Sequence, residues 1–216
     1  MTESDVEPQI LEPQIQVPPI QDPELRDRVE RYLADPATHL LGNPDAQICV
    51  IEFGDFECPY CAGAAPVLRE LVEQSDGQVR LIYRNFPLFE VHPHALTAAL
   101  AAESVAASAG EQAYWAMHDK LFAHQARLTD VDLKLYAKAI GGDPELAFGA
   151  GAQRFAPIVA ADYAAGIEVG VSATPTLFID GQPYDGRVEV GALRRATGLS
   201  ADAGRSEPRR RPWQRR

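Results

Sequence analysis

Hydrophobic residues form two short runs, residues 48–53 and residues 79–83, separated by a stretch with the spacing of an amphipathic helix. The inward positions of that helix recur at intervals of three and four, at Leu68, Leu71 and Val72. We expect the helix from residue 62 to about residue 75, because Gly77 is the residue type that often follows a helix end. Pro66 inside it should cause a kink. Strand, helix and strand in this order predict a βαβ unit.

A long helical region is expected from about residue 93 to residue 169. It opens with an alanine-rich segment, and it includes a helix whose first residues form a weak capping pattern. The predicted helices cover residues 95–109, residues 111–124 and the segment from Thr129 to Gly141, and a further one begins at Asp143-Pro144.

Two more strands are expected after the helical region. Residues 176–179 are apolar, Asp180-Gly181 is typical of a hairpin turn, and residues 187–190 would be the partner strand. Residues 191–197 would then form a last short helix. At the other end, Gly42-Asn43-Pro44-Asp45 is a turn that leads into the first core strand.

The chain has 216 residues, of which 46% are hydrophobic, enough for one core with an inserted helical subdomain. Residues 42–198 are expected to form this domain. Residues 1–22 are rich in proline, glutamine and acids, a composition typical of a disordered leader. Residues 23–41 predict a short amphipathic helix and a linker, and residues 199–216 predict an arginine-rich, disordered tail.

The net charge of -11 argues against nucleic-acid binding by the chain as a whole. Residues 205–216 hold six Arg and one Glu, and they are expected to be a solvated terminus, with nucleic-acid binding as the alternative. The first residues carry acids and no long apolar segment, so no cleaved signal peptide is expected, and no apolar run of about 18 residues predicts a membrane span. With only three cysteines, a disulfide-stapled secreted scaffold is excluded and a cytoplasmic location is expected.

The stretch Cys58-Pro59-Tyr60-Cys61 follows the first predicted strand and opens the predicted helix. A Cys-x-x-Cys pair in this position is typical of a thiol–disulfide redox site. Unpaired N–H groups and partial positive charge at a helix start stabilise a thiolate at Cys58, and Cys61 lies where it can resolve a mixed disulfide. Asp55 and Glu57 are expected to oppose the thiolate because they are negatively charged. The alternative is a buried, inert cysteine pair.

Residues 53–61 (FGDFECPYC) resemble the active-site block of DsbA-like thioredoxin-fold proteins, and residues 170–181 (GVSATPTLFIDG) resemble their cis-proline block. Between them, residues 92–95 and residues 114–122 are similar to the family's helical insertion. The likeness covers about residues 42–198. It implies an α/β thioredoxin fold, with a four- or five-stranded sheet and an inserted α-helical subdomain, and a disulfide oxidoreductase that acts on protein thiols.

The resemblance also implies roles at the site. Glu52, six residues before Cys58, resembles the family's buried acid and would accept the proton that Cys61 loses; the alternative is a glutamate at the sheet edge that faces water. Thr174-Pro175 would be a cis peptide that faces the disulfide and offers its backbone to an extended substrate. The alternative there is a trans proline that starts a strand.

Pro59, Tyr60 and Phe56 would complete the substrate-binding surface. Tyr60 brings no positive charge, whereas the strongest oxidants of the family carry His in the dipeptide. We therefore expect a less stabilised thiolate at Cys58 and a milder oxidant, an expectation that a Cys58 pKa near or below 4 would contradict.

His92 and His94, together with the two motif cysteines, raise the alternative of a structural zinc protein. Such a protein would unfold when a chelator removes the metal. Histidines separated by one residue point to opposite faces of a strand, and zinc sites mostly use wider spacing, so both are expected to be residues of a helix start. No metal is expected, and no separate cofactor is needed because the cysteine pair holds the electrons. Cys49 alternates with apolar residues and is expected to be a small buried residue.

The expected activity is disulfide exchange with proteins, recycled by a partner that the sequence does not identify. At a cytosolic poise of about -220 to -320 mV a strongly oxidising pair would stay reduced, so reduction or isomerisation is expected there. Export by an unrecognised route would favour an oxidant instead. A different class is a redox-switched binding or adaptor module that uses its termini, and peroxide reduction and glutathione transfer on the same fold are further alternatives.

Overall fold

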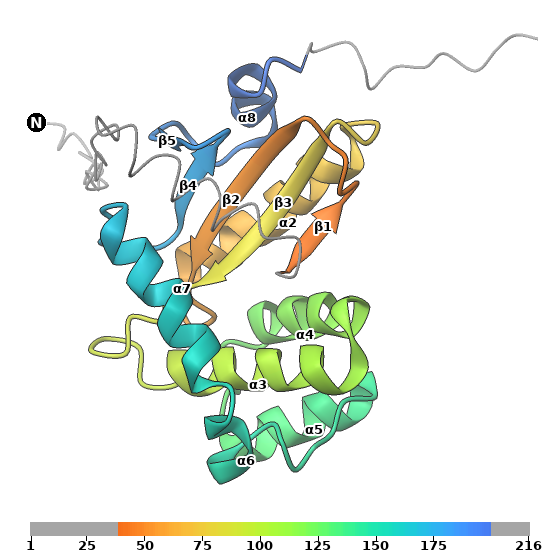
Figure 1. The fold of residues 1–216 in the computed structure, drawn as a ribbon, viewed down its shortest axis with the longest axis vertical. Helices are drawn as coiled ribbons and strands as arrows, with labels where there is room; N and C mark the ends of the chain where they lie inside the picture. The colour runs from red at the N-terminus through yellow and green to blue at the C-terminus, as the bar shows by residue number, and fades with distance from the viewer. Residues whose placement is uncertain (1–38, 200–216) are drawn as a thin grey trace, which may run out of the picture.

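The computed structural model describes residues 39–199 and places five strands in one mixed sheet (Figure 1). The strands are β1 (Leu40–Gly42), β2 (Ile48–Gly54), β3 (Val79–Asn85), β4 (Thr176–Ile179) and β5 (Gln182–Tyr184). Their order across the sheet is β1-β3-β2-β4-β5, with β2 and β3 parallel and the other neighbouring pairs antiparallel. β2 is therefore an interior strand with a paired neighbour on each side.

The described part of the chain excludes most of the predicted terminal segments. The leader expected at residues 1–22, all but the end of the linker expected at residues 23–41, and all but the first residue of the tail expected at residues 199–216 lie outside it. Within residues 39–199, no helix is both long enough and apolar enough to cross a bilayer.

Helix α2 (Pro59–Glu73) connects β2 to β3, so the predicted βαβ unit is confirmed. The helix begins three residues earlier than the sequence predicts, because a proline is well tolerated in the first turn of a helix. Its buried face includes the predicted positions Leu68, Leu71 and Val72, and Pro66 lies inside it. Helix α8 (Val190–Ala196) packs against α2.

The chain between β3 and β4 is helical, as predicted. Its helices are α3 (Ala95–Ala109), α4 (Glu111–Ala123), α5 (Asp130–Ile140), α6 (Gly149–Gln153) and α7 (Ala156–Glu168). Thr129 caps the start of α5 and Gly141 ends that helix at a φ of 93°, which confirms both predicted boundaries. Figure 1 shows this insertion at the end of the sheet where β2 and β3 finish. The chain enters α2 from the same end of β2, so the insertion lies close to the Cys-x-x-Cys stretch.

The predicted position of the partner strand in the last hairpin is wrong. The partner of β4 is β5, at Gln182–Tyr184, and not residues 187–190. Asp180 and Gly181 both have positive φ, 48° and 74°, and they reverse the chain within two residues. Strand pairing therefore resumes directly after the turn.

The helix expected to begin at Asp143-Pro144 is also absent, and the next helix, α6, starts at Gly149. The Asp143 carboxylate accepts a hydrogen bond from the Glu145 N–H at 2.9 Å, and this local bond favours a turn over a helix. A third difference is β1, which lies where the sequence predicted linker and turn. It exists because its backbone pairs with β3, a contact that local sequence does not encode.

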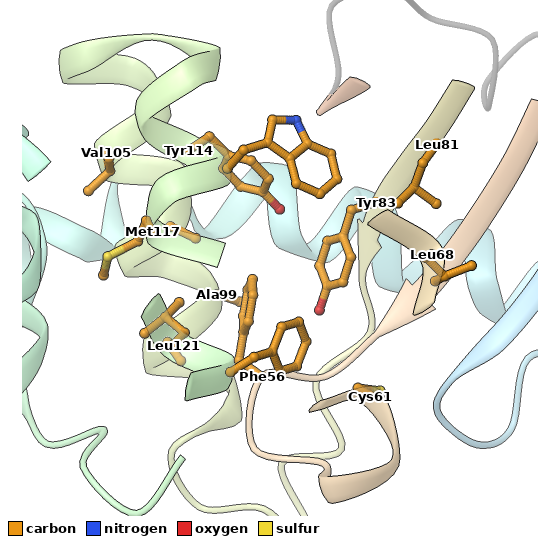
Figure 2. Close-up of a cluster of buried hydrophobic side chains, with 14 of the residues drawn as sticks. Phe56, Cys61, Leu68, Leu81, Tyr83, Ala99, Val105, Tyr114, Met117 and Leu121 are labelled. Atoms are coloured by element: carbon orange, nitrogen blue, oxygen red, sulfur yellow. The ribbon is translucent and has the colours of Figure 1, made fainter. Parts of the chain in front are cut away.

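Apolar side chains are buried on both faces of the sheet. The larger cluster lies between the sheet, α2 and the insertion, and it includes Cys58 and Cys61; Figure 2 shows part of it around Tyr83. A second cluster on the other face gathers around Phe53 and Phe178. The two cysteines thus lie where the sheet, α2 and the insertion pack together.

Candidate active site

Cys58 and Cys61 lie at the start of α2. Cys58 is the capping residue, with φ -72° and ψ 122°, and Cys61 lies in the first turn. Both are free thiols, exposed by only 3% and 0%. The Cys58 Sγ lies 3.3 Å from the carbonyl oxygen of Thr174, to which its thiol form donates a hydrogen bond. The segment before β4 therefore lies directly against the Cys58 sulfur.

The surroundings of the two thiols give them opposite pKa shifts. A hydrogen bond from the Cys61 thiol lowers the pKa of Cys58 to about 6, with help from the backbone at Tyr60 and Cys61, although burial opposes the shift. Burial raises the pKa of Cys61 well above its usual value, and the charge of Glu52 adds to the shift. At neutral pH Cys58 is mostly a thiolate and Cys61 a thiol. The Cys58 pKa of about 6 lies well above 4, so it agrees with the expectation of a less stabilised thiolate.

Asp55 and Glu57, expected to oppose this thiolate, are held by other partners. The Asp55 carboxylate accepts hydrogen bonds from the N–H groups of Glu57 at 2.7 Å and Leu88 at 2.8 Å, and His92 Nδ1 lies 2.8 Å from it. The Glu57 carboxylate accepts from the His94 N–H at 2.6 Å. These bonds fasten the loop between β3 and α3 to the segment just before the cysteine pair.

His92 and His94 lie directly before α3, in which His94 is the capping residue. In the described part of the chain, no three His, Cys, Asp or Glu side chains gather closely enough to hold a metal ion. Cys49 is half buried on β2 rather than fully buried, and burial raises its pKa. It lies on a different face of β2 from Glu52, since side chains three apart on a strand point to opposite faces.

Glu52 is completely buried on the interior strand β2, so the alternative of a water-facing glutamate at the sheet edge is wrong. Neither of its carboxylate oxygens has a hydrogen-bond partner among residues 39–199. Burial, and secondly the negative charge of Cys58, raises the pKa of Glu52 to about 8. A carboxyl group with this pKa can gain and lose a proton near neutral pH, as a general acid or base must.

Thr174 and Pro175 lie directly before β4, and the peptide bond between them is cis. Thr174 is buried and Pro175 is half buried. Pro59 and Tyr60 are exposed at the start of α2, Tyr60 by 66%. An incoming chain can therefore contact these side chains beside Cys58.

The prediction that Phe56 belongs to the substrate-binding surface is wrong, because its ring is only 1% exposed. The ring stacks on Tyr83, with 5.2 Å between centroids, and lies against Phe122 of α4 at 5.0 Å. Burying a large aromatic ring is strongly favourable, and the insertion provides the partner that completes its burial. Phe56 thus supports the segment just before Cys58 from inside the core.

Gln125, in the loop between α4 and α5, is a site residue that sequence reasoning missed. Its side-chain amide donates hydrogen bonds to the backbone carbonyl oxygens of Phe56 at 2.9 Å and Cys58 at 2.8 Å. A half-buried glutamine in a loop has no recognisable pattern in the sequence. Only the packing of the insertion against the sheet brings it to the cysteine pair.

Comparison with known proteins identifies relatives of this chain. The family model described as thioredoxin matches residues 34–197. A sodium/proton antiporter, NhaA 1, from Salinispora arenicola is 43% identical over 188 residues, which are 82% of this chain and 27% of that protein. NhaA 3 from Salinispora tropica is 40% identical over 176 residues, 79% of this chain and 26% of that protein. The chain thus spans about a quarter of the length of these curated relatives.

Solved structures also resemble this chain. A thioredoxin-like oxidoreductase from Silicibacter pomeroyi is 29% identical, with a TM-score of 0.65, covering 78% of this chain and 95% of that one. The thiol-disulfide exchange protein alpha-DsbA2 from Wolbachia pipientis is 20% identical, with a TM-score of 0.69, covering 81% of this chain and 95% of that one. The fold is therefore the DsbA-like thioredoxin fold with an inserted helical subdomain, as the sequence predicted.

Proposed function

This chain belongs to the thioredoxin family, and on that premise we propose that it exchanges disulfides with proteins through Cys58 and Cys61, as a cytoplasmic reductant or isomerase. One observation carries the proposal: Cys58 caps α2 with its sulfur 3.3 Å from the Thr174 carbonyl oxygen, Cys61 is buried in the first turn, and these surroundings lower the pKa of Cys58 and raise that of Cys61. A thiolate is the form that attacks a disulfide. Cys58 is thus the nucleophile, and the buried Cys61 is the resolving thiol.

The first half of the reaction is an attack of the Cys58 thiolate on one sulfur of a substrate disulfide. The substrate S–S bond breaks, a mixed disulfide forms and one substrate sulfur leaves as a thiolate. The mixed disulfide removes the negative charge of Cys58, which is one of the two causes of the raised Glu52 pKa, so the ionised form of Glu52 becomes more accessible. Cys61 then gives its proton to the Glu52 carboxylate and attacks the Cys58 sulfur. The second substrate thiolate leaves, so the substrate gains two electrons and Cys58–Cys61 becomes the disulfide.

The exposed residues at the start of α2 and the segment before β4 would hold the substrate. Thr174 would offer its backbone to an extended chain, and Pro175 would shape the groove beside the sulfur. Pro59 and Tyr60 would supply apolar contact, since both are exposed at the helix start.

Reduction of insulin disulfides by an equimolar amount of the reduced full chain, with no other thiol present, tests this proposal, with Cys58→Ser, Cys61→Ser and Cys49→Ala compared in parallel. We expect Cys58→Ser to abolish the reduction, and Cys61→Ser to stop at a mixed disulfide that is visible by mass spectrometry. Cys49→Ala should keep full activity, because Cys49 is not part of the pair. Activity that survives in Cys58→Ser would contradict the proposal.

The direction of exchange follows from the reduction potential of the cysteine pair, measured by equilibration in graded thiol buffers. A value below about -220 mV supports a cytosolic reductant or isomerase. A value near about -120 mV, typical of a strong oxidant, would instead favour an exported dithiol oxidant.

A second candidate function comes from the antiporter relatives, because this chain is similar to about a quarter of each of them. In this candidate the domain is a redox switch, in which the Cys58–Cys61 disulfide changes how the domain binds a sodium/proton antiporter. The test replaces the similar segment of the Salinispora arenicola antiporter with this chain and measures sodium-driven proton exchange in proteoliposomes. Exchange rates that differ between reducing and oxidising buffers, and become equal when both cysteines are serine, would support the switch. Equal rates in both buffers would contradict it.

A further inference from the structure

Two buried side chains near Cys61 carry polar atoms that no residue of the described chain satisfies. Both carboxylate oxygens of Glu52 and the hydroxyl of Tyr83 lack a hydrogen-bond partner among residues 39–199. Each side chain is completely buried. Buried polar atoms are normally paired, and each one left unpaired in a native protein calls for an explanation, of which a redox or catalytic role is one. Their position therefore needs a physical explanation.

The sheet places these two side chains next to each other. Glu52 of β2 and Tyr83 of β3 are direct partners in the parallel register, so their side chains project from the same face of the sheet. The face is the one that packs against α2, because Tyr83 belongs to the same core cluster as Cys58 and Cys61. The phenol and the carboxyl group thus share one apolar compartment with the resolving cysteine.

Neighbouring residues hold the Tyr83 ring in place. Phe56, just before the cysteine pair, stacks on it, and the His118 ring contacts it edge-on at 4.9 Å. Gly54 leaves room for it, since a Cβ atom there would lie only 2.7 Å from the Tyr83 hydroxyl oxygen. Figure 2 shows the hydroxyl pointing to the side of the cluster where Phe56 and Cys61 lie. The ring is therefore fixed with its polar end toward the cysteine pair.

We propose that the Tyr83 hydroxyl is the hydrogen-bond donor that stabilises negative charge at Glu52 and Cys61 while the proton passes between them. The inference rests on the proposed function, because it concerns the step in which Cys61 resolves a mixed disulfide. In that step the Cys61 S–H bond breaks, its proton goes to the Glu52 carboxylate, and the Cys61 thiolate attacks the Cys58 sulfur. Before the transfer the negative charge is on the ionised Glu52, and after it on Cys61; the Tyr83 hydroxyl, which has no partner among residues 39–199, would donate to whichever group carries the charge.

Tyr83 acts as a donor throughout, because it never ionises in the working pH range. Burial first, and then the charges of Cys61 and Glu52, raise its pKa well above the usual value. The titratable groups facing it are Glu52 on β2, Asp55 before α2, Cys61 on α2, and Tyr114 and His118 on α4. Of these, His118 is kept neutral by a pKa that burial lowers, and Asp55 is held by three hydrogen bonds of its own. Tyr83 would thus act as a hydrogen-bond donor to Glu52 and Cys61.

The experiment uses the full reduced chain with Cys49→Ala in every variant, so that only the pair reacts. An aromatic disulfide, 5,5'-dithiobis(2-nitrobenzoate), releases one coloured thiolate when Cys58 attacks and a second when Cys61 resolves the mixed disulfide. Stopped-flow absorbance from pH 6 to pH 9 separates the two phases. In Tyr83→Phe we expect the second phase to slow by about tenfold, the size expected when a hydrogen bond to a charged group is lost, and the first phase to stay unchanged. The midpoint of the second phase should also move to higher pH, because the ionised Glu52 carboxylate would lack the proposed donor.

Tyr114→Phe is the matched control. Tyr114 is also completely buried with a hydroxyl that lacks a partner among the described residues, but it stacks on His39 rather than facing the pair. It should leave both phases unchanged. In a Glu52→Gln background, adding Tyr83→Phe should slow the second phase by much less than tenfold, because the proton acceptor is already gone.

Three results would overturn the role of Tyr83: a second phase in Tyr83→Phe with the original rate and pH midpoint, an equal loss in Tyr114→Phe, or full additivity with Glu52→Gln. The thermal midpoint of each variant separates a loss of fold from a loss of the donor. Absence of a second phase in the parent chain would overturn the proposed exchange function itself, so the two failures are distinguishable.

Discussion

The side-chain amide of Gln125 lies 2.8 Å from the backbone carbonyl oxygen of Cys58, to which it donates a hydrogen bond. The two residues are 67 positions apart, and Gln125 belongs to the helical insertion. The same amide holds the carbonyl of Phe56. The insertion therefore helps to hold the backbone that carries the Cys58 sulfur, and Gln125 is the side chain that bonds to it directly.

Replacing Gln125 with Ala should raise the pKa of Cys58 above its present value of about 6. Without the amide, the carbonyl oxygens of Phe56 and Cys58 lose their donor, and their uncompensated partial negative charge opposes the thiolate. Thiolate absorbance at 240 nm as a function of pH measures the shift. The free energy of unfolding should fall by about 1 to 2 kcal/mol, as expected for two lost hydrogen bonds. Gln153→Ala, at an exposed position of α6, should change neither quantity, and an unaltered Cys58 pKa in Gln125→Ala would show that the contact is structural only.

Glu52 should make the reduced protein less stable as the pH rises. Its pKa is about 8 in the folded state and 4.5 ordinarily, so the unfolded chain loses this proton first. The free energy of unfolding therefore falls between pH 4.5 and about 8, by roughly 3 kcal/mol at pH 7, and the fall ends above the folded pKa. Glu52→Gln should remove this loss.

Urea unfolding at pH 5 and pH 8 measures the effect as the difference between Glu52→Gln and the parent chain. The variant should be clearly more stable than the parent at pH 8 and nearly equal to it at pH 5. Glu73→Gln, at an exposed position of α2, serves as the control and should show no such dependence. A parent chain as stable as Glu52→Gln at both pH values would exclude a buried carboxyl with a raised pKa.

His92 and His94 should differ in their effect on stability, although only one residue separates them in the sequence. His92 pairs with the buried Asp55 carboxylate, which raises its pKa despite partial desolvation, whereas His94 is exposed. Stability from the pair is fully present below the ordinary histidine pKa and is lost as the pH rises through the folded value. His92→Gln should therefore lower the free energy of unfolding by about 1 kcal/mol at pH 6 and by much less at pH 9. His94→Gln is the control, and equal losses in both variants would contradict a stabilising contact between His92 and Asp55.

Tyr60→His should make the cysteine pair more oxidising. Tyr60 is exposed beside Cys58, and an imidazolium there would stabilise the thiolate, hence the reduced form of the protein. A tenfold stabilisation of the reduced form corresponds to a potential about 30 mV less negative. Equilibration in graded thiol buffers at pH 6 measures the change, and Tyr60→Phe should leave the potential as it is. A potential that does not rise in Tyr60→His would show that Tyr60 does not control the redox poise.

Local sequence was sufficient for most of the elements that carry the site. The apolar run before Cys58 forms β2, and the residues whose spacing predicts a helix, among them Leu68 and Leu71, form α2. The helical region also lies where the pattern predicts it. These elements depend on contacts between residues close in the chain or on a period that repeats within a few turns. The last hairpin and the segment after Asp143 were mispredicted because a two-residue turn and one side-chain bond outweighed strand and helix propensity.

The sequence by itself determined the chemistry: a Cys-x-x-Cys pair at a helix start, an acid inside an apolar strand and a proline before a later strand. Only the tertiary structure decided the environment of that chemistry. It buried Glu52 on an interior strand and buried Phe56 in the core. It also placed Tyr83, His92 and Gln125 beside residues 55–61. Residue type and local spacing set what a side chain can do, but its pKa and its partners depend on burial and on distant segments that meet only when the sheet and the insertion pack together.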